Sequence, residues 1–541
     1  MTENKLTNKE IISVIDTYAK LLELHEENPF KVKSFKNASF TLSKIEIELA
    51  NANAEELTNI NGIGKSLSAK IIELNESGSI IELEKLLEKT PLGVLELLKI
   101  KGLGPSKIRS IWRELEITSP GELLYACYEN RLSTLKGFGA KTQEKVIQNL
   151  EFMQKNASFF RISDAHKLAQ FIEKELSNSE EFRFVGEYLR AEQVLKSLEI
   201  LVLEGSKSAV FLENLKINSE ADGEIPLKLF YTTKEEFEYE FFKLSCENKF
   251  LKNINFEKLE KNQYTSENHI FEALNIPYII PERRIDFYEN QVLNKLTSEA
   301  VELKDLKGLL HLHTKYSDGQ NSLEEMLLAA KKLGYEYMGV SDHSKSAFYA
   351  NGLNEERILQ QHEEIDSLNL KYPNFKIFKS IESDIINDGN LDYSNEVLSS
   401  FDFVIASIHS NLSMDENKAK LRLTKAIENP YTTILGHPTG RLLLSRKGYP
   451  VDHKYLIEAC AKNNVAIELN ANPYRLDLDW KYINLALENG VKISINPDAH
   501  SLKGIEDNYY GVAVARKSLL EKSMLLNNMT SEEISNYFKK K

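Results

Sequence analysis

The sequence predicts a multidomain protein with a helical N-terminal region, an α+β middle segment and a C-terminal α/β barrel. Three observations lead to this fold class. The chain has 541 residues, which is too long for one ordinary core. A Gly-x-Gly pattern recurs three times within residues 1–150. From residue 306 onward, short β-branched apolar runs alternate with helical stretches, and this alternation predicts a parallel sheet.

The composition is that of a soluble globular protein, with 42% hydrophobic and 28% charged residues. No segment is apolar enough to span a bilayer, and the N-terminus lacks a secretory pattern, so we expect a cytoplasmic protein without a membrane partner. Cys127, Cys246 and Cys460 are isolated from one another, which fits a reducing compartment. The net charge of −13 argues mildly against nucleic-acid binding, but it is spread along the chain and leaves room for local basic surfaces.

The N-terminal repeat consists of "NINGIGKSLSAKII" (59–72), "LKIKGLGPSKIRSI" (98–111) and "STLKGFGAKTQEKVI" (133–147). Each copy predicts two helices joined by a tight glycine turn, with backbone N–H groups at the second helix start available to a phosphate. The pattern resembles the helix-hairpin-helix motif, which binds the nucleic-acid backbone without reading sequence. Plain helix packing is the alternative, and three copies that each carry a lysine favour DNA binding. The predicted DNA-binding residues are Gly62, Gly64, Lys65, Lys70, Gly102, Gly104, Lys107, Gly137, Gly139 and Lys141.

The middle segment reads as a strand, a turn, a helix and a strand in residues 182–205, followed by another strand in residues 225–233. Residues 291–305 are polar and carry no motif, so we expect a linker. The predicted domains are 1–88 and 89–155 for the hairpin regions, 156–290 for the middle segment, 291–305 for the linker and 306–541 for the barrel.

Seven strand-like runs follow residue 306, and each ends in a polar residue that can hold a metal or a phosphate. These residues are His311 and His313, His343, Glu382, His409, His437, Asn470, and Asp498 with His500. Strand C-termini of a (β/α) barrel open on one face, so residues far apart in the chain should converge there. The period of two along a strand places His311 and His313 on the same side.

This set favours a metal centre, although a single histidine of this kind would usually be a hydrogen-bonded core residue. Imidazole with carboxylate, including Asp318, suits Zn²⁺ or Mn²⁺, and eight or nine ligands imply two or three ions. Such clusters act in phosphodiester hydrolysis. The remaining histidines have no such context and are expected to be structural or surface residues: His25, His166, His269, His362 and His453.

The motifs "HLHTKYSDG", "SDHS", "IESDIINDGNLDY", "ASIHS", "GHPTGR", "IELNANPYRLDL" and "NPDAHS" resemble those of the PHP (polymerase and histidinol phosphatase) phosphoesterases. More narrowly, they resemble the version fused to bacterial family X DNA polymerases. The resemblance implies a distorted (β/α)7 barrel with a trinuclear site built from His311, His313, His343, Glu382, His409, His437, Asp498 and His500, with Asp318 as a ninth ligand. It implies catalytic roles for Glu382, as bridging carboxylate, and for His343.

Two arginines follow from the same motifs. Arg441 in "GHPTGR" and Arg475 in "NANPYRLDL" are candidates for binding the substrate phosphate, because a guanidinium matches phosphate bidentately. Arg441 is the one we assign a catalytic role. A structural ion pair is the alternative for both.

The resemblance also implies a polymerase-beta-like palm and thumb in residues 156–290, where three aspartates normally hold two Mg²⁺ ions beside a Gly-Ser turn. Here the turn contains Glu187, the first two aspartate positions are Ser197 and Glu199, and the third aligns with Lys228. One carboxylate therefore stands where three are needed. We expect a degenerate palm without Mg²⁺ and without polymerase activity. Lys70 aligns with the Schiff-base lysine of related lyase domains, although a phosphate contact or a solvated side chain is the commoner role.

The sequence therefore predicts a DNA-repair enzyme that hydrolyses phosphodiesters as a metal-dependent 3′→5′ exonuclease, with abasic-site or 3′-end processing as a further activity. We expect it to act as a monomer on gapped, nicked or 3′-recessed DNA, with two or three Mn²⁺ or Zn²⁺ ions. The alternatives are a working gap-filling polymerase with a proofreading PHP domain, a small-molecule PHP phosphatase, and a binding scaffold without catalysis.

Overall fold

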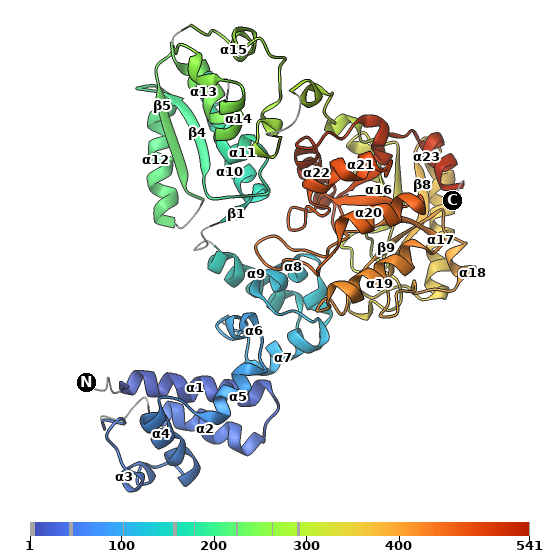
Figure 1. Ribbon diagram of the computed structural model, residues 1–541. Coiled ribbons are helices and arrows are strands. Elements are labelled where there is room, and N and C mark those ends of the chain that lie inside the picture. Colours follow the sequence, from blue (N-terminus) through green and yellow to red (C-terminus); the bar gives the residue numbers. More distant parts are fainter. Residues whose placement is uncertain are drawn as a thin grey trace. The chain divides into compact units, whose positions relative to one another are not determined.

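The structure of the protein, a computed structural model, describes residues 6–42, 47–100, 102–154, 159–177, 179–222, 225–261, 263–288 and 293–539 (Figure 1). The chain forms two compact units. The N-terminal unit comprises Met1–Tyr128 and Leu132–Leu150, and the second unit comprises Glu129–Arg131 and Glu151–Lys541. The boundaries predicted at 155/156 and 290/291 lie outside the described residues, and those at 88/89 and 305/306 stay predictions.

The N-terminal unit is helical, as predicted. Its elements are α1 (Asn8–Leu24), α2 (Pro29–Leu42), α3 (Ala54–Thr58), α4 (Lys65–Ser77), α5 (Ile81–Glu88), α6 (Leu92–Leu97), α7 (Pro105–Glu114), α8 (Pro120–Tyr128), the 3-10 turn η1 (Arg131–Thr134) and α9 (Ala140–Gln154). Helix α1 begins with a capping box, because Thr7 accepts from the Glu10 backbone N–H while the Glu10 carboxylate accepts from that of Thr7. Its apolar residues Ile11, Ile15 and Tyr18 recur at helical spacing and are buried.

The three predicted glycine turns are present in this unit. Gly62, Gly102 and Gly137 have φ of +93°, +89° and +87°, a left-handed backbone conformation that other residues rarely adopt. Gly64 and Gly104 then precede α4 and α7 directly, without a side chain to cap the first N–H groups. Each turn therefore delivers an uncrowded helix start, the feature on which the predicted phosphate contacts depend.

The second unit begins with an α+β region, residues 159–288, which we call the palm-like region. Its three-stranded sheet has the order β2 (Phe182–Val185), β4 (Leu198–Leu203), β5 (Leu227–Thr232), with β2 antiparallel and β5 parallel to β4. A smaller pair joins β1 (Phe160–Arg161) to β3 (Val194–Leu195). The helices are α10 (Ile162–Glu175), α11 (Gly186–Leu189), α12 (Lys207–Asp222), α13 (Phe237–Ser245), α14 (Asn248–Asn253) and α15 (Glu267–Ala273), with 3-10 turns η2 (Phe256–Lys258), η3 (Pro281–Arg283) and η4 (Asp286–Tyr288). Two further 3-10 turns, η5 (Leu293–Thr297) and η6 (Leu303–Asp305), lie between this region and the barrel.

The C-terminal region of this unit is the predicted distorted (β/α)7 barrel. Seven parallel strands stand in chain order: β6 (Gly308–Leu309), β7 (Tyr337–Val340), β8 (Lys376–Asp384), β9 (Phe403–Ser407), β10 (Thr432–Leu435), β11 (Ala466–Asn470) and β12 (Ile493–Asn496). The helices are α16 (Leu323–Lys332), α17 (Glu355–Lys371), α18 (Asn395–Leu398), α19 (Glu416–Ile427), α20 (His453–Lys462), α21 (Ile483–Glu488), α22 (Asn508–Ala515) and α23 (Ser531–Lys539), with 3-10 turns η7 (Phe348–Ala350), η8 (Trp480–Tyr482), η9 (Lys503–Asp507), η10 (Lys522–Met524) and η11 (Leu526–Asn528). None of the described helices is long and apolar enough to cross a membrane.

The barrel closes without a full ladder between its first and last strands. Past β6 and β12, Leu312 and Ala499 form one isolated parallel bridge. At the other end the buried Asn527 side chain fills the gap, since its Nδ2 donates to the Gly308 carbonyl at 3.0 Å and its Oδ1 accepts from the Ile495 N–H at 2.8 Å. One isolated bridge and one side chain, rather than a full ladder of hydrogen bonds, therefore join the first and last strands of the barrel.

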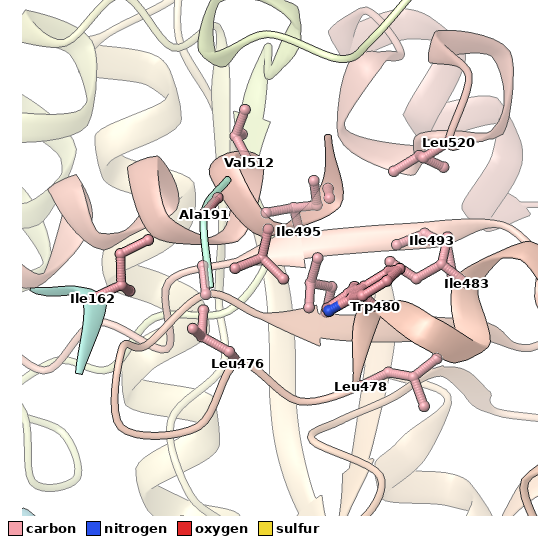
Figure 2. Close-up of a cluster of buried hydrophobic side chains, with 14 of the residues drawn as sticks. Ile162, Ala191, Leu476, Leu478, Trp480, Ile483, Ile493, Ile495, Val512 and Leu520 are labelled. Carbon is pink, nitrogen blue, oxygen red and sulfur yellow. The ribbon is translucent and has the colours of Figure 1, made fainter. Parts of the chain in front are cut away.

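The palm-like region and the barrel share one hydrophobic core. Figure 2 shows Ile162 and Ala191, from the palm-like region, in the same buried cluster as Leu476, Ile495 and Val512 of the barrel. A sheet or helix buries an apolar face only against a partner, and here each region supplies the partner for the other.

Polar contacts reinforce the shared core. The fully buried Lys517 of the barrel donates to the Arg190 carbonyl at 2.9 Å and pairs with Glu192 in the palm-like region. The segment expected to be a linker also joins in, because Leu296 and Val301 are buried in the same cluster. The palm-like region and the barrel are thus packed against each other rather than tethered by a free linker.

Candidate metal centre

The strand ends bring all nine predicted metal ligands to one end of the barrel. They are His311, His313, Asp318, His343, Glu382, His409, His437, Asp498 and His500, and each lies within 4 Å of a carboxylate or imidazole of another member. The rings of His311 and His313 face the same side, with centroids 5.3 Å apart, as the strand period predicts.

Glu382 at the end of β8 stands at the centre of one half of this set. Its Oε1 lies 3.3 Å from His311 Nε2, 3.1 Å from His409 Nε2 and 3.0 Å from His437 Nε2, and its Oε2 lies 3.0 Å from His343 Nδ1. A carboxylate with imidazoles on both oxygens is placed to bridge two ions. The bridging role of Glu382 stays a prediction.

Asp318 and Asp498 organise the other half. Asp498 Oδ1 lies 3.0 Å from His313 Nε2, while Asp318 lies 3.6 Å from His343 Nε2 and 3.4 Å from His500 Nε2. Asp498 has φ of +51°, and such strained backbone positions cluster at functional sites. The loop residue Asp318 therefore belongs with the strand-end ligands.

The donor set fits bound metal ions. Three overlapping groups each bring their ligand atoms within 4.8 Å of one another: His313, Asp318, His343 and His500; His311, His313 and Glu382; and His343, Glu382 and His409. Within this ligand set, the following buried atoms have no hydrogen-bond partner among the described residues: His311 Nε2, His313 Nδ1, Asp318 Oδ2, His343 Nδ1, Glu382 Oε2, His437 Nδ1 and His500 Nε2. Several of them approach one another closely but without hydrogen-bond alignment. Unpaired buried polar atoms are costly, and divalent cations would satisfy them together.

The electrostatics of the cluster favour positive charge. Burial disfavours the charged imidazoles of His409 and His500, but the neighbouring carboxylates outweigh it and raise the pKa of each to about 10. His313, packed against two other imidazoles, has its pKa lowered to about 3 by burial and by those neighbours. The carboxylates thus hold positive charge in a site where burial alone would exclude it.

Two buried carboxylates outside the predicted set orient its histidines. Glu468 on β11 accepts from His311 Nδ1 at 2.7 Å and from the His437 backbone N–H at 2.7 Å. Asp384 at the end of β8 pairs with His409 Nδ1. An ionised carboxylate only accepts, so the proton must sit on Nδ1 and Nε2 is left to bind a cation.

The sequence analysis missed both residues, although a signal for each was present. Asp384 lies two positions after Glu382 on the same strand, and Glu468 lies two positions before Asn470. Because alternate strand residues share a face, both had to point toward the same side as a residue already singled out.

The structure separates the two predicted phosphate-binding arginines. Arg441 Nη1 pairs with Asp479 at 2.6 Å, its Nε donates to the Arg475 carbonyl at 3.0 Å, and its Nη2 donates to the Leu476 carbonyl. This is the alternative of a structural ion pair. Arg475 instead borders the ligand set, since its Nε lies 3.7 Å from Asp498 Oδ2.

The positions that the resemblance assigns to a degenerate polymerase centre lie in the palm-like region. Glu199 on β4 stands opposite Lys228 on β5, and the two side chains form an ion pair of 2.7 Å. Gly186 packs so closely that a Cβ there would lie 1.6 Å from Glu199 Oε2. The Glu187 carboxylate accepts from the Lys196 backbone N–H at 3.0 Å. A lysine therefore neutralises the remaining carboxylate of this site.

Packing within the hairpin does not require a glycine at the second glycine position of any of the three hairpins. Added Cβ atoms at Gly64, Gly104 and Gly139 would meet nothing within 4 Å. Gly64 and Gly104 also have extended φ values, −87° and −78°, that any residue adopts. The missing side chain instead leaves the helix start accessible to another backbone, as a phosphate contact requires.

Lys70 lies within a cluster of acidic side chains rather than on an open surface. Its Nζ is 2.8 Å from Glu73 and 3.2 Å from Glu82, and Tyr18 donates to the same Glu82 at 2.6 Å. Burial opposes the charge of Lys70, but its two carboxylate partners outweigh it and raise its pKa. This environment keeps the amine protonated.

Comparisons with known protein families match three segments of the chain. Residues 6–80 match the helix-hairpin-helix domain family, residues 94–151 match the SAM-like helix-hairpin-helix tandem, and residues 310–472 match the PHP domain. The "DNA polymerase/3'-5' exonuclease PolX" of Bacillus subtilis is 35% identical over 98% of this chain and 99% of its own length. Probable phosphatases of Caldicellulosiruptor bescii and Caldicellulosiruptor saccharolyticus are 29% and 28% identical, each over 35% of this chain and 78% of the relative.

Proposed function

Because the chain belongs to the bacterial family X DNA polymerases with a C-terminal PHP domain, we propose that its barrel is a metal-dependent 3′→5′ DNA exonuclease. The observation that carries the proposal is the assembled ligand set, with seven buried ligand atoms whose hydrogen-bond capacity is unused within the described residues. The Bacillus subtilis relative bears exonuclease in its name. The coarser statement, that the protein is a metal-dependent phosphoesterase or polymerase enzyme, already follows from its family.

Different residues of the barrel would have different roles in the proposed hydrolysis. Two or three Mn²⁺ or Zn²⁺ ions would supply Lewis acidity for phosphodiester hydrolysis. Glu382 and His343 would hold the ions, Glu468 would fix the orientation of His311, and Arg475 would bind the phosphate. Water adds to phosphorus, the bond to the 3′ oxygen breaks, and that oxygen leaves as a hydroxyl. The products are a nucleoside 5′-monophosphate and a strand one residue shorter.

The helix-hairpin-helix regions would hold the DNA. Three uncrowded helix starts, with Lys65, Lys107 and Lys141 in the first turn of the helix that follows, support binding to phosphates without base readout. We propose gapped, nicked or 3′-recessed DNA as substrate, and a repair role in the cytoplasm as a monomer. Processing of abasic or blocked 3′ ends would use the same barrel site.

We also propose that the polymerase centre is inactive. Mg²⁺ needs oxygen ligands, and here Ser197 replaces one carboxylate while Lys228 occupies Glu199. Glu187 adds a negative charge in the turn that should receive the nucleotide triphosphate. The rival is an active gap-filling polymerase with a proofreading barrel, and the name of the Bacillus subtilis relative carries both activities. A small-molecule phosphatase is a further rival, because probable phosphatases are among the relatives. They match only about a third of the chain, which weakens this alternative.

One experiment separates these functions. Purified protein is mixed with Mn²⁺ and end-labelled, 3′-recessed or gapped DNA, with and without the four nucleotides. We expect shortening by wild type, none by Glu382→Ala, and full shortening by the control Glu356→Ala, which changes an exposed glutamate on α17. Elemental analysis should find transition metal in the wild-type protein.

The outcomes that contradict the proposal are distinct. Undiminished digestion by a folded Glu382→Ala protein would refute the site. Template-directed extension by that same variant, in which digestion cannot mask synthesis, would replace the proposal by the gap-filling polymerase. Rapid hydrolysis of a sugar phosphate with no action on DNA would favour the small-molecule phosphatase.

A further inference from the structure

We propose that Phe348 stacks on the terminal base of the DNA strand being digested and so positions that end at the metal centre. Phe348 begins the short turn η7 in the loop 344–353, which follows the metal ligand His343. Its side chain is 88% exposed, the highest value among the large hydrophobic residues described. The proposal rests on the proposed exonuclease function and names the portion of the substrate that this loop would recognise.

The loop that carries Phe348 is firmly anchored. The Ser346 backbone N–H donates to Asp392 at 2.6 Å, and the Ser346 hydroxyl donates to Asp384 at 2.8 Å. Asp384 is the carboxylate that also orients His409. Arg357 adds a contact from α17, with Nη1 donating to the Asn351 carbonyl at 2.7 Å. The loop is thus tied directly to the support of the metal ligands.

Phe348 is the exception within this loop. Ala347, directly before the turn, and Ala350, its last residue, are fully buried. Gly352 approaches so closely that a Cβ would lie 1.9 Å from the Ser344 carbonyl oxygen. A tightly packed loop therefore presents one large apolar ring to solvent, where the ring contributes nothing to the core. Such a pre-organised ring can bind a partner with little further ordering of the loop.

Its position fits a nucleobase. Tyr349, the next residue, places its ring edge-to-face against His343, with centroids 6.4 Å apart. Phe348 is therefore the chain neighbour of a side chain that contacts the ligand set. A strand end whose scissile phosphate lies at the metal centre has its terminal base one sugar away. Every base offers a π face, so stacking on Phe348 tolerates any sequence, which suits an exonuclease without sequence preference.

The test pairs enzyme variants with substrates that differ only at the 3′ end. Wild type, Phe348→Ala and Phe348→Tyr digest 3′-recessed DNA that ends either in a normal nucleotide or in a tetrahydrofuran abasic residue. We expect Phe348→Ala to raise KM for the normal end on the order of tenfold, with kcat little changed, and Phe348→Tyr to restore it. On the abasic end, wild type and Phe348→Ala should be equal. Leu370→Ala is the matched control, since Leu370 is 85% exposed at the end of α17.

A binding measurement keeps the proposal separate from the exonuclease function. DNA ending in 2-aminopurine, with a phosphorothioate at the last linkage to slow hydrolysis, should lose fluorescence on binding to wild type and much less on binding to Phe348→Ala. Equal quenching by both proteins overturns the proposal, as does a Phe348→Ala penalty that is the same on normal and abasic ends. Quenching that depends on Phe348, together with no digestion of the unmodified 3′-recessed DNA, would support base stacking while refuting the exonuclease.

Discussion

Replacing Glu468 by glutamine should weaken metal binding even though the side chain keeps its size. Glu468 is fully buried and accepts four hydrogen bonds. Its Oε1 accepts from His311 Nδ1 at 2.7 Å and Asn496 Nδ2 at 3.0 Å, and its Oε2 accepts from the His437 N–H at 2.7 Å and Asn470 Nδ2 at 3.2 Å. Every one of these partners is a donor when Glu468 is ionised.

The magnitude follows from this count. A glutamine amide accepts through one oxygen only, so its NH₂ group must face two of the four donors. Each buried donor left unsatisfied costs about 1–3 kcal/mol, giving roughly 2–6 kcal/mol for the pair. His311 can relieve one conflict by moving its proton from Nδ1 to Nε2. That movement blocks the nitrogen that should bind the ion, and the loss of such a support typically lowers metal affinity about 10–100-fold.

The assay is the Mn²⁺ dependence of both digestion and thermal stability. We expect the Mn²⁺ concentration for half-maximal digestion to rise about 10–100-fold in Glu468→Gln, with activity partly recovered at high Mn²⁺. Asp305→Asn is a control for changing a buried carboxylate elsewhere in the same unit. A stable Glu468→Gln protein with an unchanged Mn²⁺ requirement would show that Glu468 does not orient the ligands.

Three further outcomes are expected. Because Lys70 has a raised pKa and stays protonated at neutral pH, borohydride should trap no Lys70 adduct with abasic DNA, and an adduct that disappears in Lys70→Ala would contradict this. His362 has its pKa lowered to about 4 by burial and by Lys379, against the weaker opposing charge of Asp366. As the pH falls, His362 of the unfolded chain is therefore protonated at a higher pH than His362 of the folded chain. The free energy of unfolding should fall as the pH drops from about 6.5 toward 4, by at most roughly 3 kcal/mol. The thermal midpoint of His362→Gln should depend less on pH over that range, and an equal dependence would remove His362 as the cause. DNA affinity of the full chain should fall steeply with salt and vary little with base sequence, whereas a strong sequence preference would argue against hairpin binding.

The convergence of the candidate metal ligands could be predicted because chemistry and position coincide in the chain. Alternating strands and helices force every strand end to one face, so His311 and Glu382 had to converge without any knowledge of contacts. Glu468 escaped because the search stopped at the last residue of each strand. The role of Arg441 could not be predicted, because a guanidinium binds a carboxylate and a phosphate equally well. The sequence does not show that Asp479 lies within reach of Arg441 in the fold.

Other features depend on packing that leaves no local trace. Nothing in "LLNNMT" indicates that Asn527 closes the barrel between Gly308 and Ile495. Ile162 and Ala191 look like ordinary core residues, and their sequence does not reveal that their neighbours belong to the barrel. Tertiary partners of this kind are chosen by shape, which periodicity does not encode.

The shared core of Figure 2 subjects the palm-like region to opposite constraints on its two sides. On its barrel side, truncating Ile162 to alanine would open a cavity at a cost of about 2–5 kcal/mol, so the stability of the barrel constrains this position. Glu199 and Lys228 form an ion pair on neighbouring strands and are not part of the shared cluster, so packing against the barrel places no such constraint on their charges. The charged positions can therefore vary without disturbing the shared core. The palm-like fold itself has to be kept, because the barrel packs against it.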